Sequence, residues 1–440
     1  MDAQRQPPAT QLRIHDERLH ADPSRVVLRP FHLGWHTPEG LERATRLVAD
    51  VCALSDEVAA EEYERVLHDF SGRHWQTEQL FDQRYQEVRA TLPIDTACSS
   101  ETRQRLIGSY FCHEYTYAAA ALMNPSIVPH PDQSGLPDGS CRFVMSLRAV
   151  GEGHISSIAF REGIAAPDGS YTLWPQSQFA ISAMLDREEQ LDANDRPLDG
   201  VVSVHRYQET SLSNMVIFPI TEQQRNGLED LRLVRFDHGG GEFEWIGTYT
   251  AYSGRSIRSE LLRTRDFRRF DLQEIAGRAG RNKGMALFPQ RIDGGYAMVG
   301  RQDGKNLYLI RSDRIDTWDD DGQLLMQPKY PWEFIQIGNC GSPLRIDEGW
   351  LLFTHGVGAM RKYAVGCALL DGDDPGKVLA RSPRPVLTAV DNDRAGYVPN
   401  VVYTCGALPI GRQIFIPYGI SDSAVGFATA SVDDLLAQME

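Results

Sequence analysis

The chain has 440 residues, of which 42% are hydrophobic and 24% are charged, an ordinary balance for a globular protein. Its formal net charge of −15 argues against a nucleic-acid partner, because binding to phosphate backbones needs a basic face. The first twenty residues lack the apolar segment of a signal peptide, and no apolar run approaches the roughly 18–20 residues of a membrane helix. We therefore expect a cytoplasmic protein with no membrane partner.

The cysteine and histidine patterns give no sign of a metal or a cofactor. The seven cysteines are scattered, odd in number and free of any CxxC pair, so we expect reduced thiols. His113, His130 and His154 do not have the spacing of metal ligands. The sequence therefore predicts neither a metal site nor a bound cofactor.

The first part of the chain divides into two segments. Residues 1–25 are expected to be extended or disordered, and residues 26–120 are expected to be helical. In the helical segment, Ser55 followed by Asp56 and Glu57 has the pattern of an N-cap with an acidic first turn. Further helices are predicted over residues 76–90 and 101–121.

From residue 121 to 440 the pattern changes to short β-rich runs. Turn signals separate pairs of apolar runs, which is typical of hairpins. They are Asp293-Gly294-Gly295, Gln302-Asp303-Gly304, Asp347-Glu348-Gly349 and Asp371-Gly372-Asp373-Asp374.

Strand-like runs that open on a polar residue recur five times in this region. They start near Asn124, Asp230, Lys283, Asn339 and Asn400. The last four starts are about 53–61 residues apart, enough for roughly four strands each, and the longer first interval predicts an insertion near residues 165–215. We expect an all-β fold, a five-bladed β-propeller with an N-terminal α-helical region. A pair of β-sandwiches is the alternative.

In a propeller the innermost strands line one axis, so the five polar starts would converge on a single pocket. Asp230, beside Glu229, is then a candidate general acid whose pKa must be raised by burial or by that neighbour. The alternative is a strand-end carboxylate that pairs with Arg232. Lys283 is either a pocket cation or an ordinary turn lysine.

The region from about Asn124 to the C-terminus resembles glycoside hydrolase family 130, the mannoside phosphorylases and β-mannosidases, which are five-bladed propellers. The resemblance spans about 310 residues and leaves out the helical region. The segments that carry it are LRAVGEGHISSIAF (147–160), GLEDLRLVRF (227–236), GTYTAYSG (247–254), NKGMALFPQRIDGGYAMVGR (282–301), IGNCGSPLRIDEGWLLFTHGVG (337–358), YAVGCALLDGDDPGKVLARSPRPVL (363–387), GYVPNVVYTCGA (396–407) and IPYGISDSAVGFATASVDDLL (416–436).

The resemblance implies roles for individual residues. Asp230 matches the general acid, whose proton passes through a hydroxyl of the bound mannose. The implied sugar site holds Asn124, Arg148, Glu229, Tyr403 and Asp422. The implied phosphate site holds Arg301, Arg311, Gln336, His355 and Tyr363. Gln336 stands where the family's phosphorylases have a lysine, and Gly284-Met285 stands where the family has Asp-Ala. Both changes argue against the use of phosphate.

The resemblance therefore implies an inverting enzyme that cleaves β-mannosidic linkages in a mannose-containing oligosaccharide. Phosphorolysis gives mannose 1-phosphate, needs one acid and a basic pocket, and uses inorganic phosphate as co-substrate. Hydrolysis needs a second carboxylate to activate water. We expect phosphorolysis, with a β-mannosidase as the alternative. A non-catalytic glycan-binding propeller is a further alternative, and the oligomeric state, including a homo-oligomer, stays open.

Overall fold

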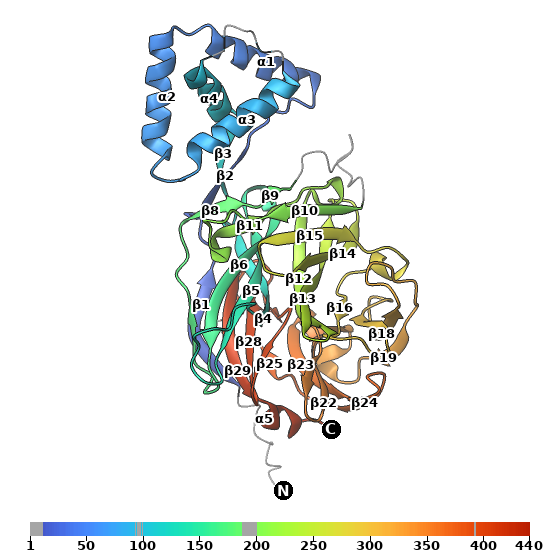
Figure 1. The fold of residues 1–440 in the computed structure, drawn as a ribbon. Helices are drawn as coiled ribbons and strands as arrows, with labels where there is room; N and C mark the ends of the chain where they lie inside the picture. The colour runs from blue at the N-terminus through green and yellow to red at the C-terminus, as the bar shows by residue number, and fades with distance from the viewer. Residues whose placement is uncertain (1–11, 93, 95–97, 99, 187–199, 391–392) are drawn as a thin grey trace. The chain divides into compact units, whose positions relative to one another are not determined.

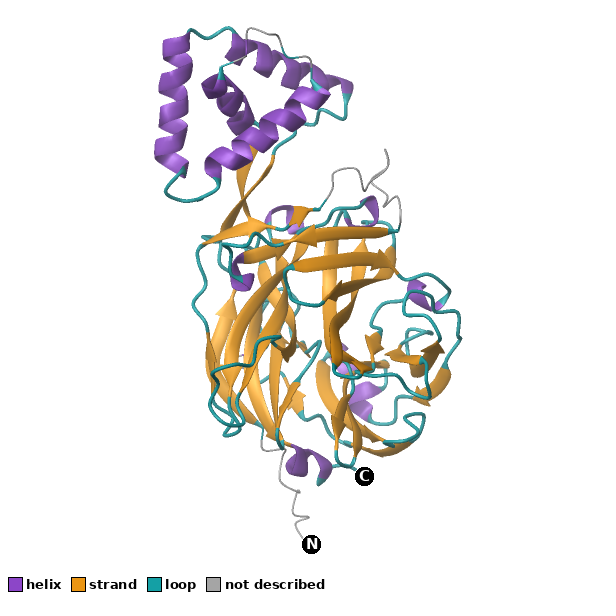
Figure 2. Cartoon of the chain, in the orientation of Figure 1, coloured by secondary structure: helices purple, strands orange, loops and turns teal. Residues whose placement is uncertain are grey.

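The computed structural model describes residues 12–92, 94, 98, 100–186, 200–390 and 393–440 (Figure 1). They fall into two compact units. The β-rich unit comprises Met1–Pro23, Tyr117–Ser177 and Ala183–Glu440, and the helical unit comprises Ser24–Thr116 and Gln178–Ser182. As expected, strands dominate the chain and long helices are confined to one part of it (Figure 2). In the described residues, no helix is both long and apolar enough to span a bilayer.

The helical unit is built from four amphipathic helices and three short strands. Its helices are α1 Pro38–Cys52, α2 Asp56–Phe70, α3 Thr77–Thr91 and α4 Glu101–Tyr110. Its strands are β2 Val26–Pro30, β3 Cys112–Thr116 and β8 Phe179–Ser182. The predicted N-cap is confirmed, because the Ser55 side chain accepts a hydrogen bond from the Val58 amide. Residues such as Val48, Phe81 and Leu106 form the core between the helices.

Two expectations for this unit are wrong. The helix predicted over residues 101–121 ends at Tyr110, because the next residues form β3, which pairs antiparallel with β2. The thiols are not all reduced, since Cys52 and Cys98 form a disulfide with Cα atoms 5.4 Å apart. Cys112, Cys141, Cys340, Cys367 and Cys405 are free.

The strands of the β-rich unit can be divided into five groups, in which β11 and the N-terminal β1 lie out of sequence order. Group one is β4 Ala121–Pro129, β5 Cys141–Val150, β6 Ser156–Ala165, β7 Tyr171–Leu173 and β11 Met215–Ile217. Group two is β9 Met184–Leu185, β10 Val201–His205, β12 Gly227–Gly239, β13 Glu242–Tyr252, β14 Ile257–Thr264 and β15 Arg269–Glu274. A single parallel pair, Gly227 with Ser156, joins β12 to β6.

The remaining groups are smaller. Group three is β16 Ala286–Leu287, β17 Tyr296–Gly300, β18 Leu307–Ser312 and β19 Gln323–Met326. Group four is β20 Gln336–Asn339, β21 Leu344–Ile346, β22 Gly349–Val357, β23 Tyr363–Leu370, β24 Val378–Arg381 and β25 Leu387–Thr388. Group five is β26 Val402–Tyr403, β27 Leu408–Ile410, β28 Gln413–Ile420, β29 Ala424–Ser431 and the N-terminal strand β1 Arg13–His20. The helix α5 Val432–Leu436 follows β29.

The four turn signals predicted as hairpins all lie between strands. They connect β16 to β17, β17 to β18, β21 to β22 and β23 to β24. The insertion predicted near residues 165–215 corresponds to β7 to β11 of the two units, and residues 187–199 within it lie outside the described part of the chain.

Each group packs its apolar side chains against the next group. Four buried clusters each combine side chains of two successive groups. From groups one and two to groups four and five, examples are Phe160 with Leu233, Phe236 with Leu287, Phe288 with Trp350, and Phe353 with Val402. Group five also packs on group one, because the Phe415 ring of β28 lies 5.7 Å from Phe143 and 4.8 Å from Tyr171. These contacts bury most of the large apolar side chains of the unit.

Candidate active site

The first strands of groups one and two carry matching irregularities. Asn124 in β4 and Asp230 in β12 have φ values of 50° and 55°, in the left-handed region, which Asn and Asp tolerate better than most residues. In both strands the pairing register shifts at this point, between Met123 and Ser126 and between Glu229 and Arg232. Such bulges re-aim side chains. Here they bring the Asn124 amide to the Asp230 carboxylate, with Nδ2 donating to Oδ1 at 2.6 Å.

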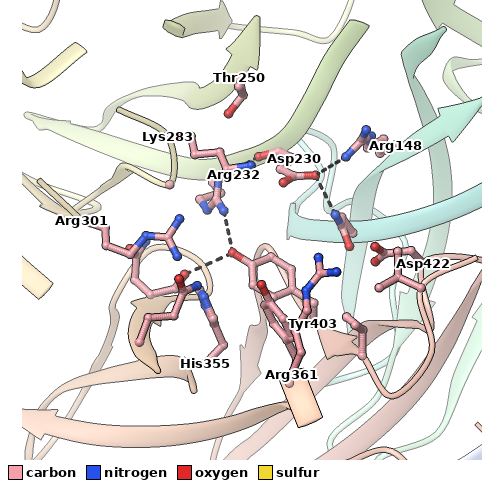
Figure 3. A pocket seen from close by; sticks show the side chains of 17 residues that line it. Arg148, Asp230, Arg232, Thr250, Lys283, Arg301, His355, Arg361, Tyr403 and Asp422 are labelled. Atoms are coloured by element: carbon pink, nitrogen blue, oxygen red, sulfur yellow. Dashed lines mark hydrogen bonds and ion pairs between the residues drawn. The ribbon is translucent and has the colours of Figure 1, made fainter. Parts of the chain in front are cut away.

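A pocket of about 290 Å³ is lined by residues from all five groups (Figure 3). Nine predicted site residues line it, and they are Asn124, Arg148, Asp230, Arg301, Gln336, His355, Tyr363, Tyr403 and Asp422. The convergence expected from the strand starts is therefore present in the structure. Lys283 and Asn339, two more of the predicted strand starts, also line it, whereas the fifth start, Asn400, does not. Arg232, Thr250 and Arg361 are polar lining residues that the prediction did not place in the site.

A second set of lining residues lies at the ends of β5, β13, β17, β22 and β28. These are the second strands, which pair antiparallel with the first strands β4, β12, β16, β20 and β26. Arg148, Thr250 and His355 lie near the ends of β5, β13 and β22, Arg301 directly follows β17, and Asp422 is the second residue after β28. Second strands run antiparallel to first strands, so their ends meet first-strand starts. Thr250, which the prediction missed, lies at such a second-strand end, so this antiparallel register could have found it.

Arg148 ties the two acidic side chains to each other. Its Nη2 donates to Glu229 Oε1 at 2.7 Å and its Nη1 to Asp230 Oδ1 at 3.3 Å, while its Nε donates to Ser156 Oγ at 2.9 Å. Glu229 is not part of the pocket lining, although it was predicted to bind substrate. The geometry makes Arg148 and Glu229 a support that fixes the orientation of Asp230.

The expectation that burial or Glu229 raises the pKa of Asp230 is wrong. Burial does favour a higher pKa, but the charges of Arg148 and Arg232 and the Asn124 hydrogen bond outweigh it and lower the pKa of Asp230. Burial raises the pKa of Glu229 instead. The carboxylate of Asp230 is therefore ionised while no sugar or anion occupies the pocket.

Arg232 holds the backbone near Asp230 and the Tyr403 side chain through three hydrogen bonds. It does not form an ion pair with the Asp230 carboxylate, which was the alternative prediction. Its Nη1 donates to the Asp230 backbone carbonyl at 3.0 Å, its Nε to the Cys340 carbonyl at 3.0 Å and its Nη2 to the Tyr403 hydroxyl at 2.7 Å (Figure 3). Burial raises the pKa of Tyr403, so the ring carries a neutral hydroxyl. Tyr403 thus presents a fixed aromatic wall.

The pocket lining also carries three cations, which we call the cationic wall, of which Lys283 lies beside Asp230 and Arg361 beside Asp422. Lys283, Arg301 and Arg361 line the pocket, and among the described residues none of them has a carboxylate within 4.0 Å. In Figure 3 the Arg301 guanidinium lies on the His355 side, and the Arg361 guanidinium lies between Tyr403 and Asp422. Burial, followed by the charges of Arg301 and Arg232, lowers the pKa of His355 well below its usual value, so the ring is neutral. This wall is suited to an anion.

Several buried polar atoms in the pocket have no hydrogen-bond partner among the described residues. They are Asn124 Oδ1, Asn339 Nδ2 and His355 Nδ1, on side chains that are 7%, 2% and 3% exposed. A buried polar atom without a partner is costly, so such atoms are usually satisfied by a ligand or by water. Their position in the pocket indicates a polar ligand.

Asp422 lies in a tight hairpin turn between β28 and β29. The turn consists of Ser421–Ser423, and Ser421 and Asp422 have φ values of 48° and 50°, in the left-handed region used where a hairpin reverses the chain. Burial, and then the charge of Asp230, raises the pKa of Asp422 to about 6. The described pocket lining therefore contains two carboxylates, Asp230 and Asp422, with different proton affinities.

The structure does not bring Arg311 to the pocket. Arg311 pairs with Ala297 in the β17–β18 hairpin, and its Nη1 donates to Asp293 at 3.0 Å. The turn that carries Arg301 connects β17 to Leu307, so Arg311 lies four residues, about 13 Å, along β18 from the pocket end. The assignment of Arg311 to a phosphate site is not supported by this placement.

Two phosphorylases are similar to this chain in sequence. A 1,2-β-oligomannan phosphorylase of Thermoanaerobacter sp. (strain X514) is 31% identical over 219 residues, covering 49% of this chain and 72% of the relative. A β-1,2-mannobiose phosphorylase of Listeria innocua is 28% identical over 230 residues, covering 51% and 63%. This chain thus spans about two thirds of the length of these two relatives.

A solved structure shares the fold. It comes from a study of the family 130 mannoside phosphorylases that reports glycoside hydrolases targeting β-1,2-mannosidic linkages in Candida mannan, and it superposes with a TM-score of 0.51 at 17% identity, covering 73% of this chain and 87% of that one. The sequence profile of the family, described as β-1,4-mannooligosaccharide phosphorylase, matches residues 195–440. With more than half of its residues matched by this profile, the chain belongs to glycoside hydrolase family 130.

Proposed function

We propose that the protein is an inverting phosphorylase that cleaves β-mannosidic linkages and releases mannose 1-phosphate. The observation that carries this proposal is the cationic wall. Lys283, Arg301 and Arg361 line the pocket without carboxylate partners in the described part of the chain, although the chain as a whole has a net charge of −15. Lys283 and Arg361 are exposed to solvent and Arg301 is half-buried, so all three are accessible to a phosphate that could accept charge-assisted hydrogen bonds from them. The relatives named above are phosphorylases.

The roles of the other residues follow from their contacts. The Asn124 amide would donate hydrogen bonds to mannose hydroxyl groups and accept them, and the Asp422 carboxylate would accept them. The Tyr403 ring would pack on the sugar face. His355, Tyr363 and Gln336 would add neutral hydrogen bonds to phosphate beside the three cations. Arg148 and Glu229 would hold Asp230 in place rather than contact the sugar.

Asp230 would donate the proton to the leaving oxygen through a mannose hydroxyl, and it must therefore be protonated in the bound complex. Lys283 is one of the charges that lower its pKa in the empty pocket. A phosphate dianion at Lys283 would cancel that charge, and a bound sugar would displace water from the carboxylate. Both changes raise the pKa of Asp230, so substrate binding itself would prepare the acid.

Hydrolysis is the second candidate. Gln336 favours it, because a neutral amide adds no positive charge with which to bind phosphate. Water, however, needs a carboxylate base across the sugar from the acid. Asp422 is the other carboxylate of the described lining, and it lies close enough to Asp230 and Arg148 for their charges to shift its pKa. The described lining offers three accessible cations but no third carboxylate, which favours phosphate as the nucleophile.

We further propose that the five groups of strands are the blades of a five-bladed β-propeller. Each group shares a core with the next, and the Phe415 contacts link the fifth group to the first, which is the packing expected of a closed arrangement. The domain limits 26–120 and 121–440, a cytoplasmic location and a homo-oligomeric state stay predictions. The Cys52–Cys98 disulfide is unusual for a cytoplasmic protein.

The proposal is tested by incubating the protein with β-1,2- and β-1,4-linked manno-oligosaccharides, with and without inorganic phosphate. We expect mannose 1-phosphate to form only when phosphate is present, because the cationic wall binds the nucleophile. Ion-exchange chromatography separates the sugar phosphate from free mannose. Release of free mannose at the same rate without phosphate would establish hydrolysis instead.

The pH dependence of turnover should report Asp422. Because its pKa is raised to about 6, Asp422 is a carboxylate above pH 6 and becomes protonated as the pH falls through 6. The protonated carboxyl group is a poorer acceptor of hydrogen bonds from sugar hydroxyl groups. The kcat/KM should therefore fall about tenfold for each pH unit below 6. The Asp422→Asn variant should have a lower kcat/KM at neutral pH and should lack this acid limb. An identical acid limb in both proteins would assign it to another group.

A further inference from the structure

Two cations of the cationic wall are carried by segments that a single side chain connects. Lys283 follows the short 3-10 helix Ala279–Arg281 after one residue, and Arg301 opens the turn between β17 and β18. Both residues line the pocket, and Figure 3 shows both side chains there. Asn282 directly precedes Lys283 but is not one of the lining residues. Its contacts nevertheless bear on the position of both cations.

The side chain of Asn282 reaches the turn that carries Arg301. Its Nδ2 donates a hydrogen bond to the backbone carbonyl of Gln302 at 2.7 Å and lies 3.4 Å from Gln302 Oε1. Because Gln302 directly follows Arg301, the bond holds the backbone one residue away from this cation. The 3-10 helix does not need the Asn282 side chain, since the backbone amide of Asn282 closes it by donating to the Ala279 carbonyl at 3.4 Å.

The backbone of Asn282 is held from another strand. Ser259 Oγ of β14 donates to the Asn282 carbonyl, which belongs to the peptide bond that leads to Lys283. Ser259 is 1% exposed, so this bond is made inside the protein. Asn282 therefore links β14, the segment of Lys283 and the turn of Arg301 through one hydrogen bond at its carbonyl and one at its side chain.

Asp303 shapes the turn that carries Arg301 from within. Its carboxylate accepts hydrogen bonds from the Asn306 backbone amide at 2.7 Å, from the Asn306 side chain and from the Tyr308 hydroxyl at 3.0 Å. These contacts all lie inside the β17–β18 hairpin, so they maintain the form of the turn without joining it to a neighbouring segment. The bond from Asn282 supplies that connection.

We propose that Asn282 is a positioning residue that sets the spacing of Lys283 and Arg301 for the attacking phosphate. The inference rests on the proposed function, since it takes these two cations as phosphate ligands. Charge-assisted hydrogen bonds to phosphate depend on short distances and good alignment, so two cations serve one anion best when their backbones keep a fixed separation. Fixing the backbone also lowers the entropy lost when long side chains are ordered on binding. Asn282 would thus act on phosphate affinity and not on proton transfer from Asp230.

Asn282→Leu tests the proposal, because leucine has a similar size and no hydrogen-bond donor. The KM for phosphate should rise about tenfold, since Lys283 and Arg301 lose their common support. The KM for the oligosaccharide should stay within about twofold of the wild-type value and kcat at saturating phosphate within about threefold. Initial rates at varied phosphate and manno-oligosaccharide concentrations give all three constants. A merely destabilised protein would behave differently, because a smaller folded fraction lowers the apparent kcat and leaves the KM unchanged.

Asn306→Leu is the matched control. Asn306 and Asn282 are both half-buried and both donate from Nδ2, but Asn306 donates to Asp303 within the turn. This variant should leave the KM for phosphate within about twofold of the wild-type value. Thermal midpoints from circular dichroism show whether each variant is folded. If Asn282→Leu does not fold, Ser259→Ala decides, because it removes the donor to the Asn282 carbonyl and should raise the same KM.

Calorimetric titration of inorganic phosphate into each protein, without sugar, gives a readout that needs no turnover. Phosphate should bind Asn282→Leu about tenfold more weakly than the wild-type protein and should bind Asn306→Leu equally well. Phosphate-dependent turnover with an unchanged KM in Asn282→Leu, or equal increases in both asparagine variants, would overturn this inference and leave the proposed function standing. If the wild-type protein binds no phosphate and releases free mannose without it, the proposed function fails, and the role of Asn282 fails with it.

Discussion

The Asp230→Asn variant is expected to lose about 10³-fold in kcat, because the amide cannot supply the proton that the leaving oxygen needs. The change keeps the size of the side chain, and its oxygen can still accept from Asn124 Nδ2. The bulge and the left-handed backbone at position 230 tolerate Asn as well as Asp. We therefore expect a folded variant with an unchanged thermal midpoint, measured by circular dichroism beside initial rates of mannose 1-phosphate formation.

Glu229→Gln is the matched control for this variant. Glu229 is the adjacent carboxylate, bonds the same arginine and lies outside the pocket lining. Its replacement should lower the rate far less, because it loosens Arg148 without removing the acid. Near-normal turnover of Asp230→Asn, or a larger loss in Glu229→Gln, would show that the acid has been assigned to the wrong residue.

Arg301→Met should raise the KM for phosphate by about 10- to 100-fold. The methionine removes a cation that has no carboxylate partner in the described structure, and a charge-assisted hydrogen bond to an anion contributes roughly 1.5–3 kcal/mol. The KM for the oligosaccharide should change much less, since Arg301 lies on the His355 side of the pocket. Initial rates over a range of phosphate concentrations measure both constants.

Arg311→Met provides the comparison, because it removes the same charge from the neighbouring strand. Arg311 is 38% exposed at its side chain and pairs with Asp293, so its loss should leave the KM for phosphate within about twofold. If both substitutions raised the KM for phosphate equally, phosphate binding would depend on the overall charge of the protein and not on a specific site at Arg301.

The sequence predicted four of the five pocket segments from polar residues that interrupt apolar runs. Asn124, Asp230, Lys283 and Asn339 line the pocket as this pattern requires, whereas Asn400 does not. Arg361 was missed, because it lies in a turn whose left-handed backbone at Met360 and Arg361 is not suggested by the type of either residue. Arg311 was misplaced because its distance from the pocket depends on where the β17–β18 hairpin turns, which only the pairing register shows.

Two other errors have a common physical origin. β3 looked like the end of a helix because its partner β2 lies more than 80 residues earlier in the chain, beyond the reach of local periodicity. The pKa of Asp230 was misjudged because the sequence shows Glu229 as its neighbour but not Arg148, which comes from another strand of the fold. In both cases the deciding contact is distant in sequence.

The pairing of β1 with β29 also bears on how the protein is made. Arg13 pairs with Thr429 and His20 with Ala424, so β1 is synthesised roughly 400 residues before the strand with which it pairs. The contacts of the helical unit are mostly local by comparison. The pocket takes side chains from Asn124 to Asp422, so it is complete only when the last strands have been added. Catalytic competence is therefore gained at the end of folding, and a chain that stops before β28 has no Asp422 with which to bind a sugar.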